Sequence, residues 1–430
     1  MRKFFPARKR GWALWIISGL FLAIFVASGP TKLTISRASL KPNGLPASPV
    51  LVNQHTTLVD WEQTRRPFHK NALQELVFGY LPDGSSTEII DKKIIANTAY
   101  NNKASIEEYT LTATAVFNGM PSKTRPFKLV VVIPKNHTGA VPVIVMQTFC
   151  PNHNTLRHPG ISKPTNIGVS CGGNGLMAKT MSYVFGRYIV TPPTEMILDH
   201  GYALATIYPS EFVADRAVSG LAALRELSAG HTDERTRWGA IAAWGWGFSR
   251  TLDVLLQDER FDPGALITYG HSRYGKSALV AAAFDARISA VISHQSGTGG
   301  ASLNKYKKGE SVREITKVYP HWFAKSYAGY AQREQDMATD QHALLALIAP
   351  RPLFLGNARR DVWSDPNGAF RAAQATKPVY ELYNKQGLIQ NKLSDFIPDA
   401  DIAFWIRPGT HGVVKEDWPA FLAFLDAHYK

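Results

Sequence analysis

Short apolar runs alternate with stretches of helical periodicity through most of the chain. The expected strands are Leu129–Ile133, Val143–Gln147, Ala203–Tyr208, Ala265–Tyr269, Ala290–Ser293, Leu353–Leu355 and Ile402–Ile406. The expected helices are Arg66–Phe78, Arg237–Gln257, Gly275–Phe284, Ala369–Thr376 and Glu416–Tyr429. Apolar strands separated by helices form a mostly parallel sheet that helices cover on both faces. The pattern therefore predicts an α/β fold of three layers.

Three segments depart from this alternation. Apolar and polar residues alternate over Ile106–Phe117, which predicts antiparallel strands. The segments 183–203 and Asn304–Asp340 are long and have no clear period, so we expect irregular insertions that form lids or pocket walls.

The expected helix Arg237–Gln257 has an aromatic face made of Trp238, Trp244, Trp246 and Phe248. Such a face can stack on a ligand, but packing against the sheet is the simpler explanation. We therefore expect these side chains in the core.

The first 30 residues have a composition of their own. Arg2, Lys3, Arg8, Lys9 and Arg10 precede an uncharged, apolar stretch from Gly11 to Pro30. A basic segment followed by an apolar one is typical of an export signal, and Ala27-Ser28-Gly29 is compatible with a cleavage site. The stretch is also nearly long enough to span a bilayer as an uncleaved anchor. We expect an exported protein that is periplasmic, secreted or membrane-anchored.

Composition and charge narrow the class of protein. The chain has 430 residues, 45% of them hydrophobic and 11% aromatic, which indicates a substantial core. Of the net charge of +14, five positive charges lie in the first 30 residues. The remaining excess would attract an acidic substrate, and solvated surface lysines explain it equally well. Because no nucleic-acid-binding motif is present, we expect no nucleic acid partner.

The chain has two cysteines, Cys150 and Cys171. In an oxidising compartment they are close enough in sequence to pair, and two free buried thiols are equally compatible with the sequence. No spacing of His and Cys residues predicts zinc, and we expect neither a metal nor a cofactor.

The octapeptide 270–277, Gly-His-Ser-Arg-Tyr-Gly-Lys-Ser, fits two chemistries. As G-x-x-x-x-G-K-S it matches a phosphate-binding loop. As G-x-S followed by a glycine, it resembles a nucleophile elbow with one extra residue before the second glycine. Both motifs occur where a strand turns sharply into a helix, as Ala265–Tyr269 does here, so the local sequence does not separate them.

The rest of the chain favours the elbow. A phosphate-binding loop needs a carboxylate at the end of a neighbouring strand to hold magnesium. The strand Ala290–Ser293 runs into His294-Gln295 and the strand Leu353–Leu355 into Gly356-Asn357, so neither supplies one. An exported enzyme would also lack nucleoside triphosphate.

A serine hydrolase needs an acid and then a histidine after its nucleophile, and both are present. Asp361 follows the strand Leu353–Leu355, and His411 follows the last expected strand. Ser272 would be the nucleophile, His411 its base and Asp361 the group that orients the imidazole. The backbone N–H of Arg273 would stabilise the oxyanion.

Other residues compete for these roles. Asp365 is a second candidate for the acid, and Asp361 is preferred because it lies nearer the strand end. His294 and His342 are less suitable as bases, since one precedes the acid and the other lies in a helix-like run. His271 is expected to pack at the elbow.

Several further segments, in the same order along the chain, carry a family resemblance. They are Gly239–Trp244, Gly270–Lys276, Ser296–Ala301, Gly309–Ser311, Pro320–Phe323, Asp340–His342, Ala349–Pro352 and Asp361–Pro366. Through them the chain resembles the glucuronoyl esterases, carbohydrate esterase family fifteen, from about Trp61 to the C-terminus. The resemblance implies an α/β-hydrolase fold and a serine esterase that acts without a cofactor.

The resemblance also implies a substrate and its contacts. The expected substrate is the ester between (4-O-methyl-)glucuronic acid of glucuronoxylan and a lignin alcohol. By matching position, the Arg273 guanidinium would assist the oxyanion, which a fixed cation does well. Lys276, Glu310 and Trp363 would hold the sugar. From the residues alone, Lys276 is equally a surface cation and Trp363 equally a loop-packing residue.

Two departures from the family pattern stand out. Many members have a catalytic glutamate just before the Ser-Gly-x-Gly-Gly segment, where this chain has Gln295. The acid role then falls on Asp361, a position that other members use. Family members also have glycines where this chain has Cys150-Pro151, and Pro151 has no N–H to donate.

The expected organisation is a signal peptide or anchor in residues 1–30, a linker in 31–60 and an α/β-hydrolase catalytic domain in 61–430. Within enzymes, the alternative is another polysaccharide esterase, for example one resembling an acetylxylan esterase. Outside enzymes, the alternative is a catalytically silent carbohydrate-binding homologue, which the Gln295 substitution suggests.

Overall fold

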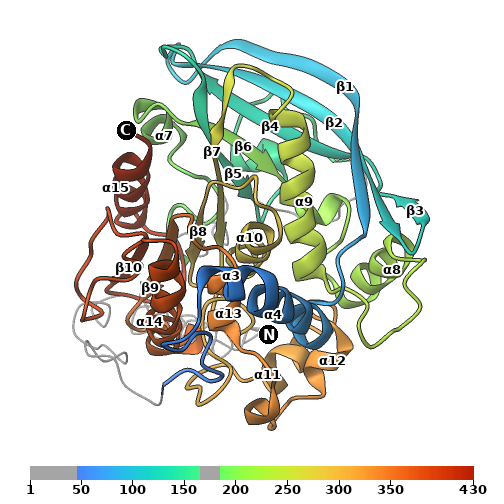
Figure 1. Ribbon diagram of the computed structural model, residues 1–430. Coiled ribbons are helices and arrows are strands. Elements are labelled where there is room, and N and C mark those ends of the chain that lie inside the picture. The colour runs from blue at the N-terminus through green and yellow to red at the C-terminus, as the bar shows by residue number, and fades with distance from the viewer. Residues whose placement is uncertain (1–45, 165–184) are drawn as a thin grey trace, which may run out of the picture.

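A mixed β-sheet runs through the centre of the molecule (Figure 1). The computed structural model describes residues 46–164 and 185–430. Within them the sheet has ten strands in the order β1-β2-β4-β6-β5-β7-β8-β9-β10, and β3 pairs with β2. The strands are β1 Gly84–Ala99, β2 Ala104–Phe117, β3 Met120–Lys123, β4 Phe127–Pro134, β5 Val141–Gln147, β6 Ala203–Ile207, β7 Phe261–His271, β8 Ala290–His294, β9 Leu353–Ala358 and β10 Ile402–Arg407.

The sheet is antiparallel at one end and parallel over the rest. Strands β1, β2, β4 and β6 pair antiparallel, and β6, β5, β7, β8, β9 and β10 pair parallel. The predicted strands are confirmed, and the mostly parallel sheet agrees with the α/β-hydrolase fold. Strand β1 was not predicted, because its sequence is largely polar and most of it is exposed at the sheet edge.

Successive residues of the strands pack alternately in two separate hydrophobic cores. In β4, Leu129 and Val131 belong to the core beneath α9, whereas Val130 and Val132 belong to the core beneath α15. All four are fully buried. Burying such a side chain contributes roughly 1.5–3 kcal/mol. The sheet therefore needs helices on both faces, which is the reason for the three layers.

Helices cover both faces (Figure 1). The first core takes residues from α4 Arg66–Leu73, α9 Ala240–Leu255, α10 Arg273–Phe284, α13 Gln341–Ala346 and α14 Pro366–Leu382. The second takes residues from α7 Thr194–Asp199 and α15 Asp417–Tyr429. The aromatic residues predicted to lie in the core do so: Trp238, Trp244, Trp246 and Phe248 are at most 4% exposed.

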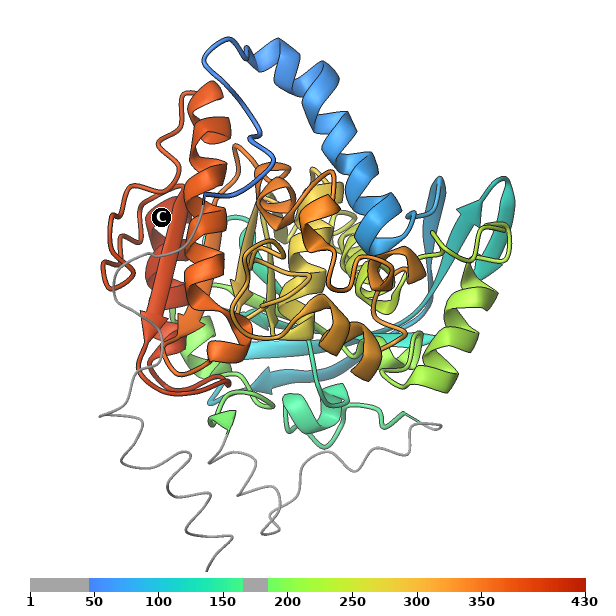
Figure 2. The ribbon, with the colours of Figure 1, turned by 90° about the horizontal axis from the view of Figure 1, so that it is seen from below.

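The remaining helices are short. They are α3 Leu58–Asp60, α5 Asn152–Thr155, α8 Ala217–Leu227, α11 Val312–Val318 and α12 Lys325–Ala328, with 3-10 turns η3 Pro209–Glu211, η4 Glu334–Asp336 and η5 Val362–Ser364. The predicted helix Arg66–Phe78 comprises α4 and the π-helical turn η2 Gln74–Phe78. Figure 2 shows α3, the π-helical turn η1 Trp61–Arg65, α4 and η2 as one continuous rod.

The segment Asn304–Asp340 is not the irregular insertion that we expected. It contains α11, α12 and η4, and a capping box between Ser311 and Glu314 starts α11. The segment also buries Trp322 and Tyr327. Its helices are shorter than the window over which helical periodicity can be recognised, which is why the pattern did not reveal them.

Several sequence predictions lie outside the described residues. These are the leader 1–30, residues 31–45 of the linker and Cys171; Cys150 is disulfide-bonded. The described end of the linker contacts the domain: Leu51 is buried, and the Pro49 carbonyl accepts a hydrogen bond from His342. None of the helices within 46–164 and 185–430 is long and apolar enough to cross a membrane.

Candidate active site

Ser272 occupies a sharp turn between β7 and α10. Its backbone has φ 57° and ψ −122°, and the helix begins at the next residue. A Cβ on Gly270 would lie 1.9 Å from the Tyr274 carbonyl oxygen, and a Cβ on Gly275 would lie 3.0 Å from the Gly270 oxygen. Both glycines are therefore needed for the turn. A non-glycine residue with positive φ is strained, and such strain is typical of a nucleophile elbow.

The lysine of the octapeptide does not face an open loop. Lys276 is 4% exposed, and its ammonium group donates hydrogen bonds to the carbonyls of Ser296 and Thr298. Two of its three ammonium protons thus bond to backbone carbonyls, whereas the lysine of a phosphate-binding loop reaches the ligand phosphates. The geometry favours the elbow interpretation over the phosphate-binding loop.

His411 and Asp361 meet at the carboxyl edge of the sheet. His411 Nδ1 and Asp361 Oδ2 are 2.7 Å apart, and the Asp361 side chain is 2% exposed. Burial alone would raise the pKa of Asp361, but His411 and the Ser364 donors more than offset it, so that this pKa is lowered. Asp361 is therefore a stable carboxylate that fixes the orientation of the imidazole.

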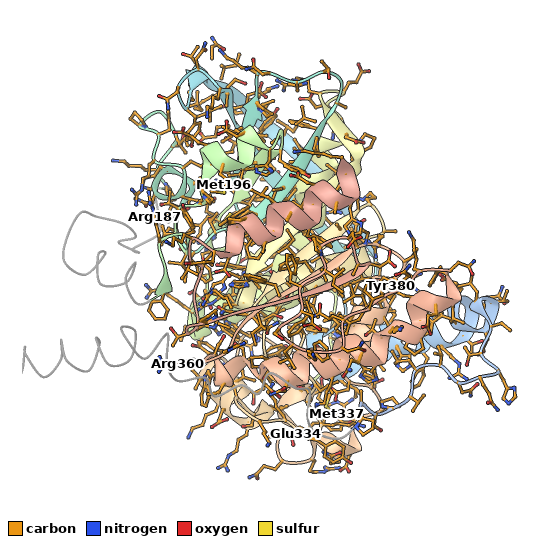
Figure 3. The ribbon with its side chains drawn as sticks, turned by 90° about the vertical axis from the view of Figure 1, so that its left-hand side faces the viewer. Arg187, Met196, Glu334, Met337, Arg360 and Tyr380 are labelled. Carbon is orange, nitrogen blue, oxygen red and sulfur yellow. The ribbon has the colours of Figure 1, made fainter. Side chains whose placement is uncertain are left out.

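The two loops that carry this pair are tied to each other. The backbone N–H of Arg359 donates to the Arg407 carbonyl, and that of Arg360 to the Gly409 carbonyl. Arg360, labelled in Figure 3, follows β9 directly. The parallel pairing of β9 and β10 thus continues into the loops and keeps Asp361 and His411 together.

His271 links this pair to the elbow. Its ring centroid lies 4.7 Å from that of His411, and it directly precedes Ser272. His271 is buried, and its pKa is well below the usual value because of burial and the neighbouring His411. His411 therefore packs on a neutral ring beside Ser272. Within the described residues, the Ser272 hydroxyl has no hydrogen bond to His411, and in unliganded sites such bonds are often long.

The competing candidates lie elsewhere. Asp365 caps α14, where it accepts a hydrogen bond from the Gly368 N–H. His294 is fully buried and contacts the Gly412 carbonyl and Asp417. His342 bonds to the Pro49 carbonyl. Of the candidate acids and bases, the structure brings only Asp361 and His411 into contact.

Gln295 braces the loop that carries His411. It is 1% exposed and has φ 51°. Its Oε1 accepts a hydrogen bond from the Gly412 N–H at 2.7 Å, and its Nε2 donates to the Thr410 carbonyl at 3.4 Å. The amide thus spans the backbone on both sides of His411. A carboxylate could not donate to Thr410, so glutamine is suited to this contact.

A buried ion pair also holds the loop that carries His411. Arg407, 3% exposed, donates hydrogen bonds to the carbonyls of Pro408, Thr410 and Gly412, and it pairs with Asp417 at 2.9 Å. Burial alone would raise the pKa of Asp417, but His294 and Arg407 lower it to about 2. Sequence reasoning missed this pair because no local motif marks it.

Arg273 is held on the opposite side of the elbow from His411. Its guanidinium pairs with Asp215 and lies 5.0 Å from the centroid of the Trp322 ring. Asp215 also accepts hydrogen bonds from Trp322 Nε1 at 2.8 Å and His321 Nε2 at 3.0 Å. Asp215 thus fixes a cation beside the elbow. It was not among the sequence candidates.

The three predicted sugar-binding residues share one region. The Glu310 N–H donates to the Trp363 carbonyl, and the Glu310 carbonyl accepts from Thr298, whose own carbonyl binds Lys276. Burial lowers the pKa of Lys276 to about 8 although Glu310 opposes it, and burial raises the pKa of Glu310 although Lys276 opposes it. Trp363 is 56% exposed.

The chain is similar to known esterases in sequence and in fold. The family model described as "Glucuronyl esterase, fungi" matches residues 231–384. Carbohydrate esterase MZ0003 from an unknown prokaryotic organism is 30% identical over 414 residues, which are 94% of each chain. The 4-O-methyl-glucuronoyl methylesterase 1 of Wolfiporia cocos is 33% identical over 33% of this chain and 37% of its own length.

Among solved structures, a glucuronoyl esterase from Solibacter usitatus superposes with a TM-score of 0.75 at 30% identity. The match covers 91% of this chain and all of that one. Both the sequence and the fold agree over nearly the whole length. The chain belongs to the glucuronoyl esterase family, carbohydrate esterase family fifteen.

Proposed function

We propose that this protein hydrolyses esters of (4-O-methyl-)glucuronic acid in glucuronoxylan, with lignin alcohols as the leaving groups. The observation that carries the proposal is the hydrogen bond between His411 and the buried Asp361, placed beside the strained turn at Ser272. Membership of the glucuronoyl esterase family supports the acyl group, as do relatives named 4-O-methyl-glucuronoyl methylesterases.

In this mechanism the Ser272 hydroxyl attacks the ester carbonyl while His411 accepts its proton. The new Ser272–acyl bond replaces the bond to the alcohol, which leaves with the proton from His411. Water then hydrolyses the acyl-enzyme by the same route. Asp361 holds the imidazole and stabilises its charged form. The negative oxygen of each tetrahedral intermediate lies near the Arg273 N–H and guanidinium, which are suited to stabilise it.

The sugar would be held on the other side of the elbow from Asp215. Lys276 and Glu310 offer a donor and an acceptor for its hydroxyls. Trp363 offers an exposed ring face, and apolar sugar faces pack on aromatic rings. Thr298 contacts both Lys276 and the Glu310 backbone, which supports a shared sugar site for these residues.

We also propose export, because the basic and apolar leader has that pattern. The destination would be the periplasm, the medium or the membrane surface through residues 11–30. This fits a polymeric plant substrate, which lies outside the cell.

Hydrolysis of benzyl glucuronate by the wild type and by Ser272→Ala tests the proposal. We expect turnover by the wild type and a loss of at least about a thousandfold in the variant. Faster release of acetate from acetylated xylan would instead favour the polysaccharide deacetylase. Retention of xylan without hydrolysis of any ester would favour the silent binding homologue.

A further inference from the structure

A cavity of about 970 Å³ opens on one side of the elbow. Arg273 and Tyr274, at the start of α10, form part of its wall. The rest comes from β2, from β4 and the segment before it, from Phe149 after β5, from residues 162–164 and from the segment 208–219 after β6. None of the proposed sugar-binding residues lines it.

The inner wall of the cavity is aromatic. Phe149, Tyr208 and Tyr274 line it, and Phe149 and Tyr274 pack with ring centroids 4.9 Å apart. The Arg273 guanidinium lies 5.5 Å from the Phe149 centroid. Phe149 is partly exposed, whereas Tyr208 and Tyr274 are buried, so the wall offers mainly the Phe149 ring to an aromatic or carbohydrate group.

Three cations at the rim of the cavity have no ion-pair partner within residues 46–164 and 185–430. They are Arg125, Lys163 and Arg216, which line the cavity and are exposed. Lys128, which also lines it, lies 3.8 Å from Glu108, and Arg273 is paired with Asp215. The three unpaired cations therefore face the same space with their charges uncompensated.

Glu211, the other carboxyl group that lines the cavity, does little to neutralise these cations. Glu211 accepts a hydrogen bond from the Lys128 N–H at 3.1 Å. Burial raises its pKa to about 7, although Lys128 opposes the shift, so that its charged form is disfavoured. The cavity is positive overall and suits an anion.

The order of the strands in the sheet indicates which part of the substrate this cavity would bind. Ser272 follows β7, and Glu310 and Trp363 follow β8 and β9. The cavity lining includes Lys128 of β4 and residues after β6, strands that lie on the other side of β7 in the sheet order (Figure 1). An ester bound at Ser272 with its sugar over β8 and β9 must direct its alcohol portion towards β4 and β6. This assignment rests on the proposed function.

We propose that this cavity binds the alcohol portion of the ester and selects alcohol portions that carry a carboxylate. The aromatic wall contacts the body of the alcohol. Arg125 and Arg216 at the rim bind the carboxylate, because a guanidinium forms paired, charge-assisted hydrogen bonds with it. Lys163 adds to the attraction as a point charge.

Two synthetic esters with one acyl group test the proposal: benzyl glucuronate and 4-carboxybenzyl glucuronate. In the wild type at low salt we expect a higher kcat/KM for the carboxylated ester. Arg125→Glu/Arg216→Glu should lower the ratio of the two kcat/KM values about tenfold. The control Lys93→Glu/Lys392→Glu makes the same change in net charge at exposed sites outside the cavity lining, and should keep the wild-type ratio.

Inhibition by the products gives a second readout that does not depend on turnover. We expect 4-(hydroxymethyl)benzoate to inhibit the wild type more strongly than benzyl alcohol, and to lose this advantage in Arg125→Glu/Arg216→Glu and in high salt. Equal ratios in wild type and rim variant would overturn the proposal. So would an equal loss in the control, since overall charge would then explain the preference. Failure of the wild type to hydrolyse either ester would instead refute the proposed function.

Discussion

The two sides of the elbow differ in how their charges are satisfied. On the His411 side, the polar groups that hold the loop bond to one another: Asp361 to the imidazole, Gln295 to Thr410 and Gly412, and Arg407 to Asp417. On the Arg273 side, Asp215 fixes one cation, and Arg125, Lys163 and Arg216 line a cavity with no ion-pair partner in the part of the chain that the structure describes.

We relate this difference to two parts of the proposed reaction, proton transfer and binding of the alcohol. Proton transfer needs groups held in one geometry, so the side chains of Asp361, Gln295 and Arg407 around His411 are buried and hydrogen-bonded. Recognition of a separate alcohol needs groups that are still free to bond. Charges left unpaired at a surface keep their hydration until a ligand replaces it.

Asp361→Asn should have the largest effect, a loss in kcat of about three to four orders of magnitude. The amide is isosteric but cannot stabilise the charged imidazole. The measurement is kcat for benzyl glucuronate, with Asp365→Asn as the matched control. Because Asp365 caps α14 and does not contact His411, its variant should keep most of the activity. Similar losses in both variants would place the acid role elsewhere.

Gln295→Ala should lower kcat about tenfold with little change in KM, because His411 loses the amide that spans its backbone neighbours. Gln295→Glu keeps the acceptor for Gly412 but not the donor for Thr410, so its kcat should lie between those of wild type and Gln295→Ala. Melting temperatures separate this effect from general destabilisation. A drop in melting temperature with unchanged kcat would show that the glutamine serves folding only.

Asp215→Asn tests whether the ion pair between Asp215 and Arg273 contributes to catalysis. The variant keeps an acceptor for His321 and Trp322 but removes the charge that holds Arg273. If a fixed guanidinium stabilises the oxyanion, kcat should fall about tenfold while inhibition by glucuronate stays the same. Ser219→Ala, in the same cavity wall, is the control. An unchanged kcat would remove Arg273 from the oxyanion site.

The smallest effect concerns pH and the sugar. Burial lowers the pKa of Lys276 to about 8 against the opposing influence of Glu310, so its charge is present below that pH and lost above it. The KM for benzyl glucuronate should therefore rise about threefold between pH 7 and pH 9. Lys276→Met should show a higher KM at pH 7 and no rise over this range. A parallel rise in the variant would assign the titration to another group.

The sequence predicted the parts of the fold that depend on long apolar patterns. The parallel strands from β4 to β10 and the helices α9, α10, α14 and α15 carry such patterns. Strand β1 does not, because an edge strand with both faces largely exposed needs no apolar alternation. The family assignment was also accessible, since its motifs are local and ordered.

Contacts between residues that are far apart in the sequence could not be predicted from the sequence. The order of Ser272, Asp361 and His411 along the chain suggested their roles, and the structure brings Asp361 and His411 into contact. Asp215 and Arg407 could not be found in this way, since each is an ordinary charged residue until folding brings its partners to it. Gln295 was interpreted as the loss of an acid, and only the structure revealed its two bonds to the histidine loop.

Two glycines on the His411 side of the elbow limit which positions of this enzyme can be mutated. A Cβ at Gly356 would lie 2.2 Å from His294 Nδ1, and one at Gly412 would lie 1.9 Å from the Phe185 carbonyl oxygen. Randomising these sites would mainly yield misfolded protein. A mutant library aimed at new specificity would do better to leave them invariant and to vary the cavity rim at 125, 163 and 216, where the side chains are exposed and have no ion-pair partner among the described residues.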